Sequence, residues 1–397
     1  MSNSTISMKK VGSVLELQRG YDLPTRSRVA GEIPIISSSG YSGYHDEFKC
    51  DGENVITGRY GTIGNVYYYN GKCWPLNTSL YVKDFKGNIP KYIYYFLKNT
   101  LKLYQVNGND KSAVPGIDRK IIHEMCVPFH EDTDYQKDIC SVLNCLDHKI
   151  TTNSNICSEM EAMAKTIYDY WFVQFDFPDE NGKPYRTSGG EMVWNEQLKR
   201  EIPKGWEIKK ISNICEIISG YPFQSSTYSK TGKYRLITIK NVQDSGIDLN
   251  VDNYVEALPE NLPDYCILSP GDILMSLTGN VGRVGLMYAD DCLLNQRVAL
   301  IKPKHSYLNV FLYFLFKSNR IKILMENIST GTSQKNLSPV DTGNLTIPFN
   351  SEIVKMFCDK LESVITKIVI AEKEKIELTK LRDWLLPMLM NGQARVE

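Results

Sequence analysis

Two glycine-rich segments carry side chains of the kind that make specific hydrogen bonds. Arg59 and Tyr60 lie within the segment Gly58–Gly64, and Arg283 directly follows Gly282. Glycine lets the backbone approach a ligand closely. A guanidinium can donate to guanine or to a phosphate, and a phenol can stack or hydrogen-bond. Arg59, Tyr60 and Arg283 are therefore candidate contacts for a partner such as nucleic acid; the alternative is a strand turn with an incidental surface arginine.

Two further polar segments suit base edges or phosphates. Lys111 and Ser112 match Gly331 and Thr332 at an offset of 220 residues, just before another shared loop. Amide groups pair with base edges and ammonium groups with phosphates, although a solvated loop would have a similar composition. A weaker candidate pair, Lys240 and Asn241, ends a predicted strand. The side chains of these segments that could contact DNA, if DNA is the partner, are Lys111, Ser112, Thr332, Gln334, Lys335, Asn336, Lys240 and Asn241.

Motifs of enzymes that modify DNA or hydrolyse nucleotides are absent from the sequence. No Pro-Pro pair occurs, although the base-binding motif of an adenine methyltransferase requires one, and no phosphate-binding G-x-x-x-x-G-K-[ST] loop is present. H-E-x-x-H and G-x-S-x-G are missing, the five histidines are scattered, and the ten cysteines form no C-x-x-C pair. We therefore expect a chain that is not an enzyme and that holds no metal or cofactor.

An ordered internal repeat runs through most of the chain. Units of this length indicate a duplicated domain, not a solenoid of short repeats. The offset between matching strings grows along the chain, which predicts a shared scaffold with divergent loops that performs one kind of recognition twice. The matches are Glu16–Tyr21 with Glu216–Tyr221 (offset 200), Gly61–Val66 with Gly279–Val284 and Leu76-Asn77 with Leu294-Asn295 (offset 218), and Val127–Phe129 with Ile347–Phe349 (offset 220).

Each half ends in a predicted long amphipathic helix. After Pro128 the apolar residues recur mostly every three or four positions, with interruptions at Lys149 and Asn153; the second half repeats the pattern with an interruption at Lys375. Such a seam needs a partner. Pairing of the two seams within the chain is favoured, and homodimerisation is the alternative. The side chains predicted in the helical core or at a subunit interface are Leu146, Ile156, Met160, Trp171, Leu361, Ile368, Leu378 and Trp384.

These patterns predict an α+β fold. Short runs such as Ile33–Ile36, Val66–Tyr69 and Leu236–Ile239 suit strands, whereas Tyr92–Leu97 and Val310–Phe316 suit buried helices. Turn-forming residues predict a linker between the halves. The predicted segments are a globular domain at 1–132, a long helix at 133–174, a linker at 175–204, a second globular domain at 205–350, and a long helix with a tail at 351–397.

Composition and charge leave the partner open. At 397 residues the chain is too long for a single hydrophobic core of ordinary size. No apolar run suits a membrane span and the N-terminus lacks a signal-peptide pattern, so we expect a cytoplasmic protein. The 46 basic residues balance the 46 acidic ones. A DNA-binding chain without a basic excess needs local basic clusters, or a partner that grips the phosphates.

Several strings resemble the specificity subunits of type I restriction–modification systems. Each string is weak by itself, but their order and the duplication extend the resemblance over almost the whole chain. The strings are Gly58–Gly64, Ser112–Ile117, Tyr168–Phe177, Ile202–Trp206, Gly331–Leu337 and Leu381–Pro387.

This resemblance implies two mixed α/β target-recognition domains, each followed by a long helix, with the helices paired as an antiparallel coiled coil and related by a pseudo-two-fold repeat. Each domain would read one half of a split, asymmetric target in double-stranded DNA, and the helices would set the spacer. Two methylation subunits would dock on the helices and supply S-adenosylmethionine and catalysis. Restriction subunits would add ATP- and Mg-dependent translocation and cleavage. The alternatives are a stand-alone dimeric DNA-binding regulator or scaffold, and a recognition half detached from a fused restriction–methylation enzyme.

Overall fold

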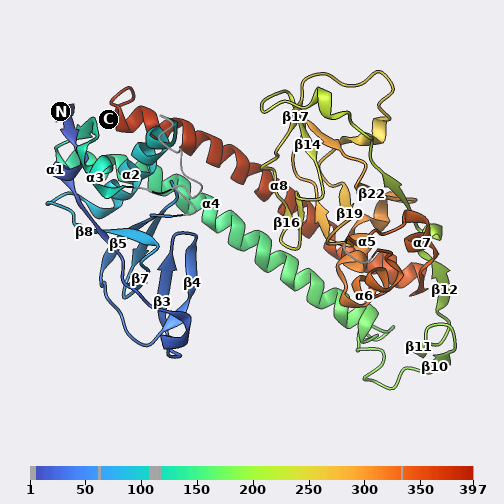
Figure 1. The fold of residues 1–397 in the computed structure, drawn as a ribbon. Coiled ribbons are helices and arrows are strands. Elements are labelled where there is room, and N and C mark those ends of the chain that lie inside the picture. Colours follow the sequence, from blue (N-terminus) through green and yellow to red (C-terminus); the bar gives the residue numbers. More distant parts are fainter. Residues whose placement is uncertain (1–5, 61–63, 107–115, 117, 332–333, 397) are drawn as a thin grey trace. The chain divides into compact units, whose positions relative to one another are not determined.

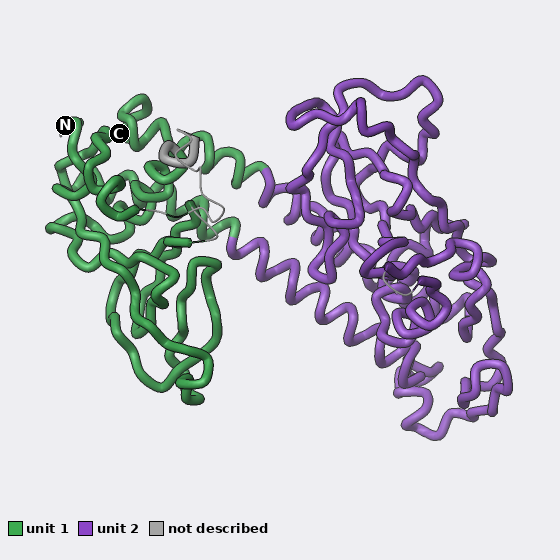
Figure 2. The backbone as a smooth tube through the Cα atoms, in the orientation of Figure 1, with its two compact units in different colours: residues 1–150, 377–397 green, residues 151–376 purple. Residues whose placement is uncertain are grey.

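The computed structural model describes residues 6–60, 64–106, 116, 118–331 and 334–396. The chain divides into two compact units (Figure 2). Unit 1 comprises residues 1–150 and 377–397, and unit 2 comprises residues 151–376. Two long helices, α4 (Thr133–Tyr168) and α8 (Ser351–Met390), each contribute one part to each unit (Figure 1).

Unit 1 is built on a four-stranded antiparallel sheet in the order β2-β8-β5-β6. A second sheet, β4-β3-β7, combines the β3–β4 hairpin with a parallel strand, and β1 pairs with β9. The strands are β1 (Ile6–Lys10), β2 (Glu16–Arg19), β3 (Ile33–Ser37), β4 (Gly40–His45), β5 (Glu53–Gly58), β6 (Val66–Asn70), β7 (Trp74–Pro75), β8 (Ser79–Asp84) and β9 (Cys126–His130). The shorter helices are α1 (Val11–Val14), α2 (Pro90–Val106) and α3 (Arg119–Glu124).

Unit 2 repeats this plan, which confirms the predicted duplication of an α+β domain. Its four-stranded sheet has the order β13-β22-β19-β20, a second sheet has the order β17-β14-β21-β18, and β12 pairs with β23. The strands of these sheets are β12 (Glu207–Lys210), β13 (Cys215–Ser219), β14 (Tyr234–Ile237), β17 (Tyr254–Val255), β18 (Ile267–Leu268), β19 (Ile273–Ser276), β20 (Val284–Leu286), β21 (Cys292–Leu294), β22 (Val298–Pro303) and β23 (Thr346–Phe349). A small β15–β16 hairpin (Val242–Gln243, Gly246–Ile247) and the helices α5 (Asn309–Lys317), α6 (Asn319–Ile328) and α7 (Pro339–Asn344) complete it.

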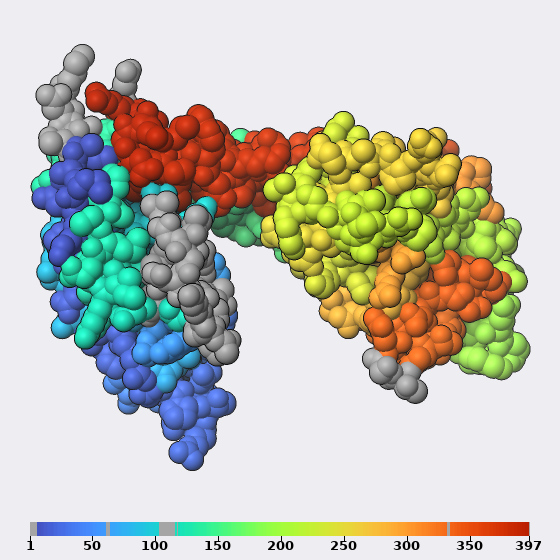
Figure 3. Space-filling model, turned by 45° about the horizontal axis from the view of Figure 1, so that its top comes forward, coloured from blue at the N-terminus to red at the C-terminus, as the bar shows by residue number. Residues whose placement is uncertain are grey.

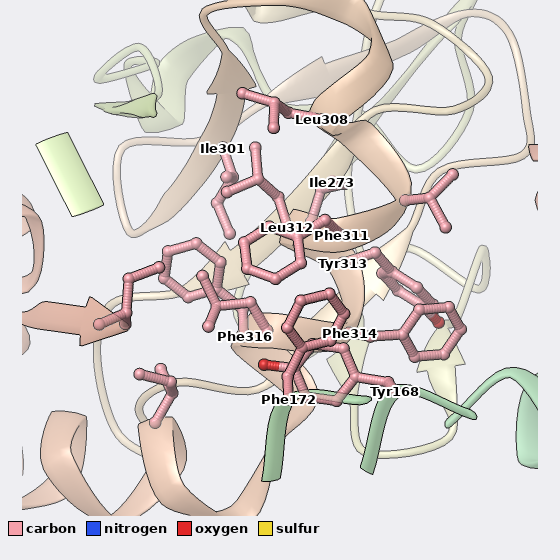
Figure 4. Close-up of a cluster of buried hydrophobic side chains, with 14 of the residues drawn as sticks. Tyr168, Phe172, Ile273, Ile301, Leu308, Phe311, Leu312, Tyr313, Phe314 and Phe316 are labelled. Atoms are coloured by element: carbon pink, nitrogen blue, oxygen red, sulfur yellow. The ribbon is translucent and has the colours of Figure 1, made fainter. Parts of the chain in front are cut away.

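The core of unit 2 is rich in aromatic rings. The apolar run predicted as a buried helix is α5, and Phe311, Phe314 and Phe316 are nearly inaccessible to solvent. Figure 4 shows them beside Ile273 and Ile301 of the main sheet and beside rings from the end of α4. Apolar burial on this scale is the main stabilising term in folding, so the helix end and the sheet are fixed to each other within the unit.

Both long helices begin at a side-chain cap. Asp132 Oδ1 accepts a hydrogen bond from the backbone N–H of Asp134 at 2.9 Å, and Asn350 Oδ1 accepts from Glu352 N at 3.0 Å. Asp and Asn are favoured at this position because they satisfy N–H groups that have no partner in the first helical turn. The two helices therefore start at equivalent points of the repeat.

The seam between α4 and α8 is antiparallel and contains a buried amide. In unit 2, Asn153 Nδ2 donates to Glu374 Oε2 at 2.8 Å, and Cys157, one turn later, contacts the carbonyl of Ile368, which precedes Glu374. In unit 1, Arg382 pairs with Asp147 at 2.9 Å. Asn153, predicted to interrupt the seam, is buried within it.

The eight side chains predicted for the helical core or an interface have different environments. Trp171, Leu361 and Ile368 are buried in the core of unit 2, and Met160 packs against that core. Leu146 and Leu378 are half-buried. Ile156 and Trp384 are exposed, so for these two only the interface prediction remains open. Ile156 faces outward because Asn153 and Cys157 occupy the inner positions of that turn.

The segment predicted as a linker is folded onto unit 2. Its hairpin is formed by β10 (Met192–Asn195) and β11 (Arg200–Pro203). Phe177 stacks on Tyr185 with a ring-centroid distance of 4.8 Å, and Phe177 also packs against Trp206. These rings, which sequence reasoning did not weigh, give the turn-rich stretch an apolar core. Helix α4 ends at Tyr168, and the chain continues as a π-helical turn from Asp169 to Val173.

Candidate nucleic-acid interface

In unit 2, backbone hydrogen bonds bring predicted contact segments from distant parts of the sequence together. Gly279 N donates to the carbonyl of Lys335 at 2.9 Å, and Leu337 N donates to the carbonyl of Leu277 at 2.8 Å. Asn336 also exchanges two backbone hydrogen bonds with Thr330. The turn after β19 and the segment 334–336 therefore form one surface.

Two more turns of unit 2 join that surface. Leu277 N donates to the carbonyl of Arg297 at 2.9 Å, which brings the turn between β21 and β22 alongside. The turn after β14 also lies close to Gly279, since a Cβ at Gly279 would lie 3.8 Å from Ile239 Cδ1. We call the turns 239–240, 278–280 and 296–297, with 334–336, the unit-2 site.

Unit 1 has an equivalent arrangement. Arg59 N donates to the carbonyl of Thr78 at 2.8 Å, and Ser38 N contacts Thr78 Oγ1 at 3.4 Å. Tyr60 forms a backbone bridge with Gly116, as Thr278 does with Asn336 in unit 2. We call residues 38–39, 59–60 and 77–78, with Gly116, the unit-1 site.

The hydrogen-bond pattern corrects the repeat alignment by one residue at these turns. Tyr21 N donates to the carbonyl of Pro75, and Tyr221 N to that of Leu294, so residues 75 and 294 are equivalent at an offset of 219. The match of Leu76-Asn77 with Leu294-Asn295, predicted at 218, is therefore wrong. The structural pairs are Asn77 with Gln296 and Thr78 with Arg297. A two-letter identity is too short to fix a register where a loop has gained one residue.

Arg59 and Tyr60 lie at the unit-1 site, and their contact with DNA stays a prediction. The guanidinium of Arg59 lies 4.5 Å from the ring centre of Tyr60, and the ring is exposed. Such a cation–π pair orients an arginine without consuming its hydrogen-bond donors. Lys111, Ser112 and Thr332 lie outside the described residues.

Lys240 and Asn241 have opposite environments. Lys240 is exposed and pairs with Asp252 at 2.7 Å, and this hydrogen bond lowers the pKa of the Asp252 carboxyl. Asn241 is 3% exposed. Its Oδ1 accepts from Thr238 N and Oγ1, and its Nδ2 donates to the carbonyls of Asp248 and Asn250. An amide with all these partners holds the turn in shape, and it has no accessible group for a base.

Arg283 is engaged with the neighbouring hairpin. Its Nε lies 3.1 Å from Asp244 Oδ2, and one terminal nitrogen donates to Gln243 Oε1 at 3.0 Å. Lys322 also hydrogen-bonds Asp244, and this bond, reinforced by the charge of Arg283, lowers the pKa of that carboxyl. In this arrangement Arg283 holds the β15–β16 hairpin through Gln243 and Asp244.

Gln334, Lys335 and Asn336 are exposed, and their predicted contact with DNA stays a prediction. Gln296 and Arg297, which the sequence analysis missed, are exposed beside them. One sequence feature could have identified Gln296 and Arg297: they directly follow the Leu294-Asn295 string of the internal repeat.

The fold and the two sites define a protein that performs one kind of surface recognition twice. The family model "Type I restriction modification DNA specificity domain" matches residues 3–162 and 203–380. The chain therefore belongs to this family, and it is a sequence-specific DNA-binding specificity subunit of the type I restriction–modification class. Membership does not favour a stand-alone regulator.

Relatives and a solved structure are similar to most of the chain. The MjaIX specificity subunit of Methanocaldococcus jannaschii is 25% identical, over 98% of this chain and 94% of the relative. The MjaVIII specificity subunit of the same organism is 25% identical over 82% and 76%. The crystal structure of an S subunit from M. genitalium has the same fold, with a TM-score of 0.61 at 17% identity, over 98% of this chain and 97% of that one.

Proposed function

We propose that unit 1 and unit 2 each read one half of a split, asymmetric DNA target through their equivalent sites. The observation that carries this proposal is that the same turns, held by matching backbone hydrogen bonds, present different side chains in the two units. A common scaffold places the turns, and the side chains on them set the sequence. Different side chains on equivalent turns predict different half-sites.

The chain supplies recognition, and partner subunits supply catalysis. Two methylation subunits dock on the long helices and bring S-adenosylmethionine, and restriction subunits, where present, bring ATP- and Mg-dependent steps. Exposed apolar side chains on the helices support such docking: Trp384 is 57% exposed in unit 1, and Ile370 is 60% exposed in unit 2. In Figure 3 the C-terminal part of α8, in red, is open along one side of unit 1.

The location we propose is the cytoplasm, where the DNA is. Among the described residues, no helix combines the length and apolar character that a membrane crossing requires.

The test is single-molecule sequencing of adenine methylation in cells that carry this gene with its neighbours, compared with cells that lack only this gene. We expect one split, asymmetric motif to disappear with the gene and to return on complementation. An unchanged methylome beside an active neighbouring methyltransferase would contradict the proposal. The purified chain alone is expected to show no methyltransferase, nuclease or ATPase activity.

A further inference from the structure

The two sites differ in where they carry an arginine. In unit 1, Arg59 lies on the turn after β5, and its counterpart in unit 2 is Leu277, since both donate a backbone N–H to the neighbouring turn. In unit 2, the arginine lies on that neighbouring turn as Arg297, whose counterpart is Thr78. Each site thus holds one arginine, but on a different turn.

The backbone of Arg297 is held by hydrogen bonds, and its side chain is accessible to a ligand. Its carbonyl accepts a hydrogen bond from Leu277 N, and its backbone N–H lies 3.4 Å from Asn295 Oδ1, so the main chain is held on both sides. The residue is exposed. Within the described part of the chain, its guanidinium has no ion pair and no side-chain hydrogen bond. A fixed backbone with an accessible guanidinium is the geometry a base-reading arginine needs.

The surroundings of Arg297 favour a polar, electron-rich partner. Gln296 precedes it, and Lys335 and Asn336 lie on the other side of the 277–279 turn, all exposed. These side chains offer donors for base edges and for phosphates. The amide of Asn241 hydrogen-bonds the carbonyl of Asp248, and Arg283 pairs with Asp244, so these two polar side chains are already engaged within unit 2.

From this arrangement we propose that Arg297 reads a guanine in the half-site bound by unit 2, although it lies on a different turn from Arg59 in unit 1. This inference rests on the proposed function. A phosphate contact serves every sequence equally, so it would suit the same turn in both units. The shift of the arginine from one turn to the other instead follows the difference between the two targets. A guanidinium pairs bidentately with guanine O6 and N7.

The experiment compares methylomes of cells that carry the complete system with wild-type, Arg297→Ala or Arg297→Gln chains. With Arg297→Ala, we expect the preference for guanine at one position of one half-site to fall about tenfold or more, while the other half-site is unchanged. Arg297→Gln should shift that position toward adenine, since an amide pairs with adenine N6 and N7. Arg59→Ala should relax the opposite half-site.

The matched control is Lys302→Ala, which removes an exposed positive charge farther along β22 and should leave the motif unchanged. Thermal melting of each purified chain checks folding. A uniform loss of methylation with an unchanged motif would assign Arg297 to a phosphate and overturn the inference, as would an unaltered methylome. If the wild-type system shows no split motif, the proposed function itself is wrong, and this result is separate from the failure of Arg297 alone.

Discussion

Asn241 and Lys240 are sequence neighbours that the same pattern predicted as DNA contacts, yet their side chains have different physical roles. Replacing Asn241 with Ala removes an amide that bonds Thr238, Asp248 and Asn250 in a buried position. Leaving such groups without partners costs about 1–3 kcal/mol. We expect the free energy of unfolding in urea to fall by this amount for Asn241→Ala.

Lys240→Ala is the matched control for that measurement. Its ammonium is exposed and its ion pair with Asp252 is solvated, and such pairs contribute little to stability. We expect unchanged unfolding and weakened methylation at the target. Equal stability of Asn241→Ala and wild type would show that the amide does not hold the turn.

His130 makes the stability of unit 1 depend on pH. The ring is 1% exposed, its Nε2 lies 2.9 Å from the carbonyl of Leu389, and burial lowers its pKa from the usual 6.5. Because the unfolded chain takes up the proton first, stability is fully present above pH 6.5 and is lost as the pH falls below that value. We expect the melting temperature to drop between about pH 8 and about pH 5.5.

The variant His130→Gln identifies the group responsible for that drop. Its amide can donate to Leu389 without titrating, so the melting temperature should change less over the same interval. Burial also lowers the pKa of His123, whose Nε2 accepts from Leu17 N, so some pH dependence remains. A variant with the full wild-type pH dependence would rule His130 out.

At the scale of elements, one pair of glycines places the recognition turns. Gly20 and Gly220 are equivalent; a Cβ on Gly20 would lie 2.1 Å from the carbonyl oxygen of Leu76, and one on Gly220 2.4 Å from that of Leu294. Since backbone cannot yield as a side-chain end does, Gly20→Ala should displace the turn at Thr78, and Gly220→Ala the turn at Arg297. We expect each to cost about 1–3 kcal/mol of stability.

The methylome separates the two effects of these glycine substitutions. Gly20→Ala should impair only the half-site of unit 1, and Gly220→Ala only that of unit 2. Gly343→Ala is the control. Gly343 lies in helix α7, and a Cβ there would lie 3.4 Å from Ser212, an ordinary contact distance. Loss of both half-sites from one substitution would contradict independent sites.

Helices and strands could be predicted from the sequence better than the contacts between them. Short apolar runs predicted α5 and the strands β3 and β6, because buried elements are built from such runs. The apolar stripe predicted Ile156 in the helical core or at an interface, and the structure leaves only the interface open, since the stripe does not reveal that a buried amide, Asn153, shares the seam. Arg297 was missed because its equivalence to Thr78 depends on backbone hydrogen bonds between turns, which no local pattern records.

At the scale of the whole molecule, the ruler hypothesis makes the two long helices set the spacer between half-sites. The borders of the two units fall between residues 150 and 151 on α4 and between 376 and 377 on α8. Seven helical residues inserted at both borders would therefore leave the contacts inside each unit intact. They lengthen both helices by about 10 Å and keep the phase of the seam.

We expect this double insertion to lengthen the spacer by about three base pairs while both half-sites stay the same, as read from the methylome. The same insertion in α4 alone stretches one connection and not the other. It must then break pairs such as Arg382 with Asp147 in unit 1 or Asn153 with Glu374 in unit 2, so methylation should be lost. A double insertion that altered a half-site and kept the spacer would refute the ruler, because recognition would then depend on the helices themselves.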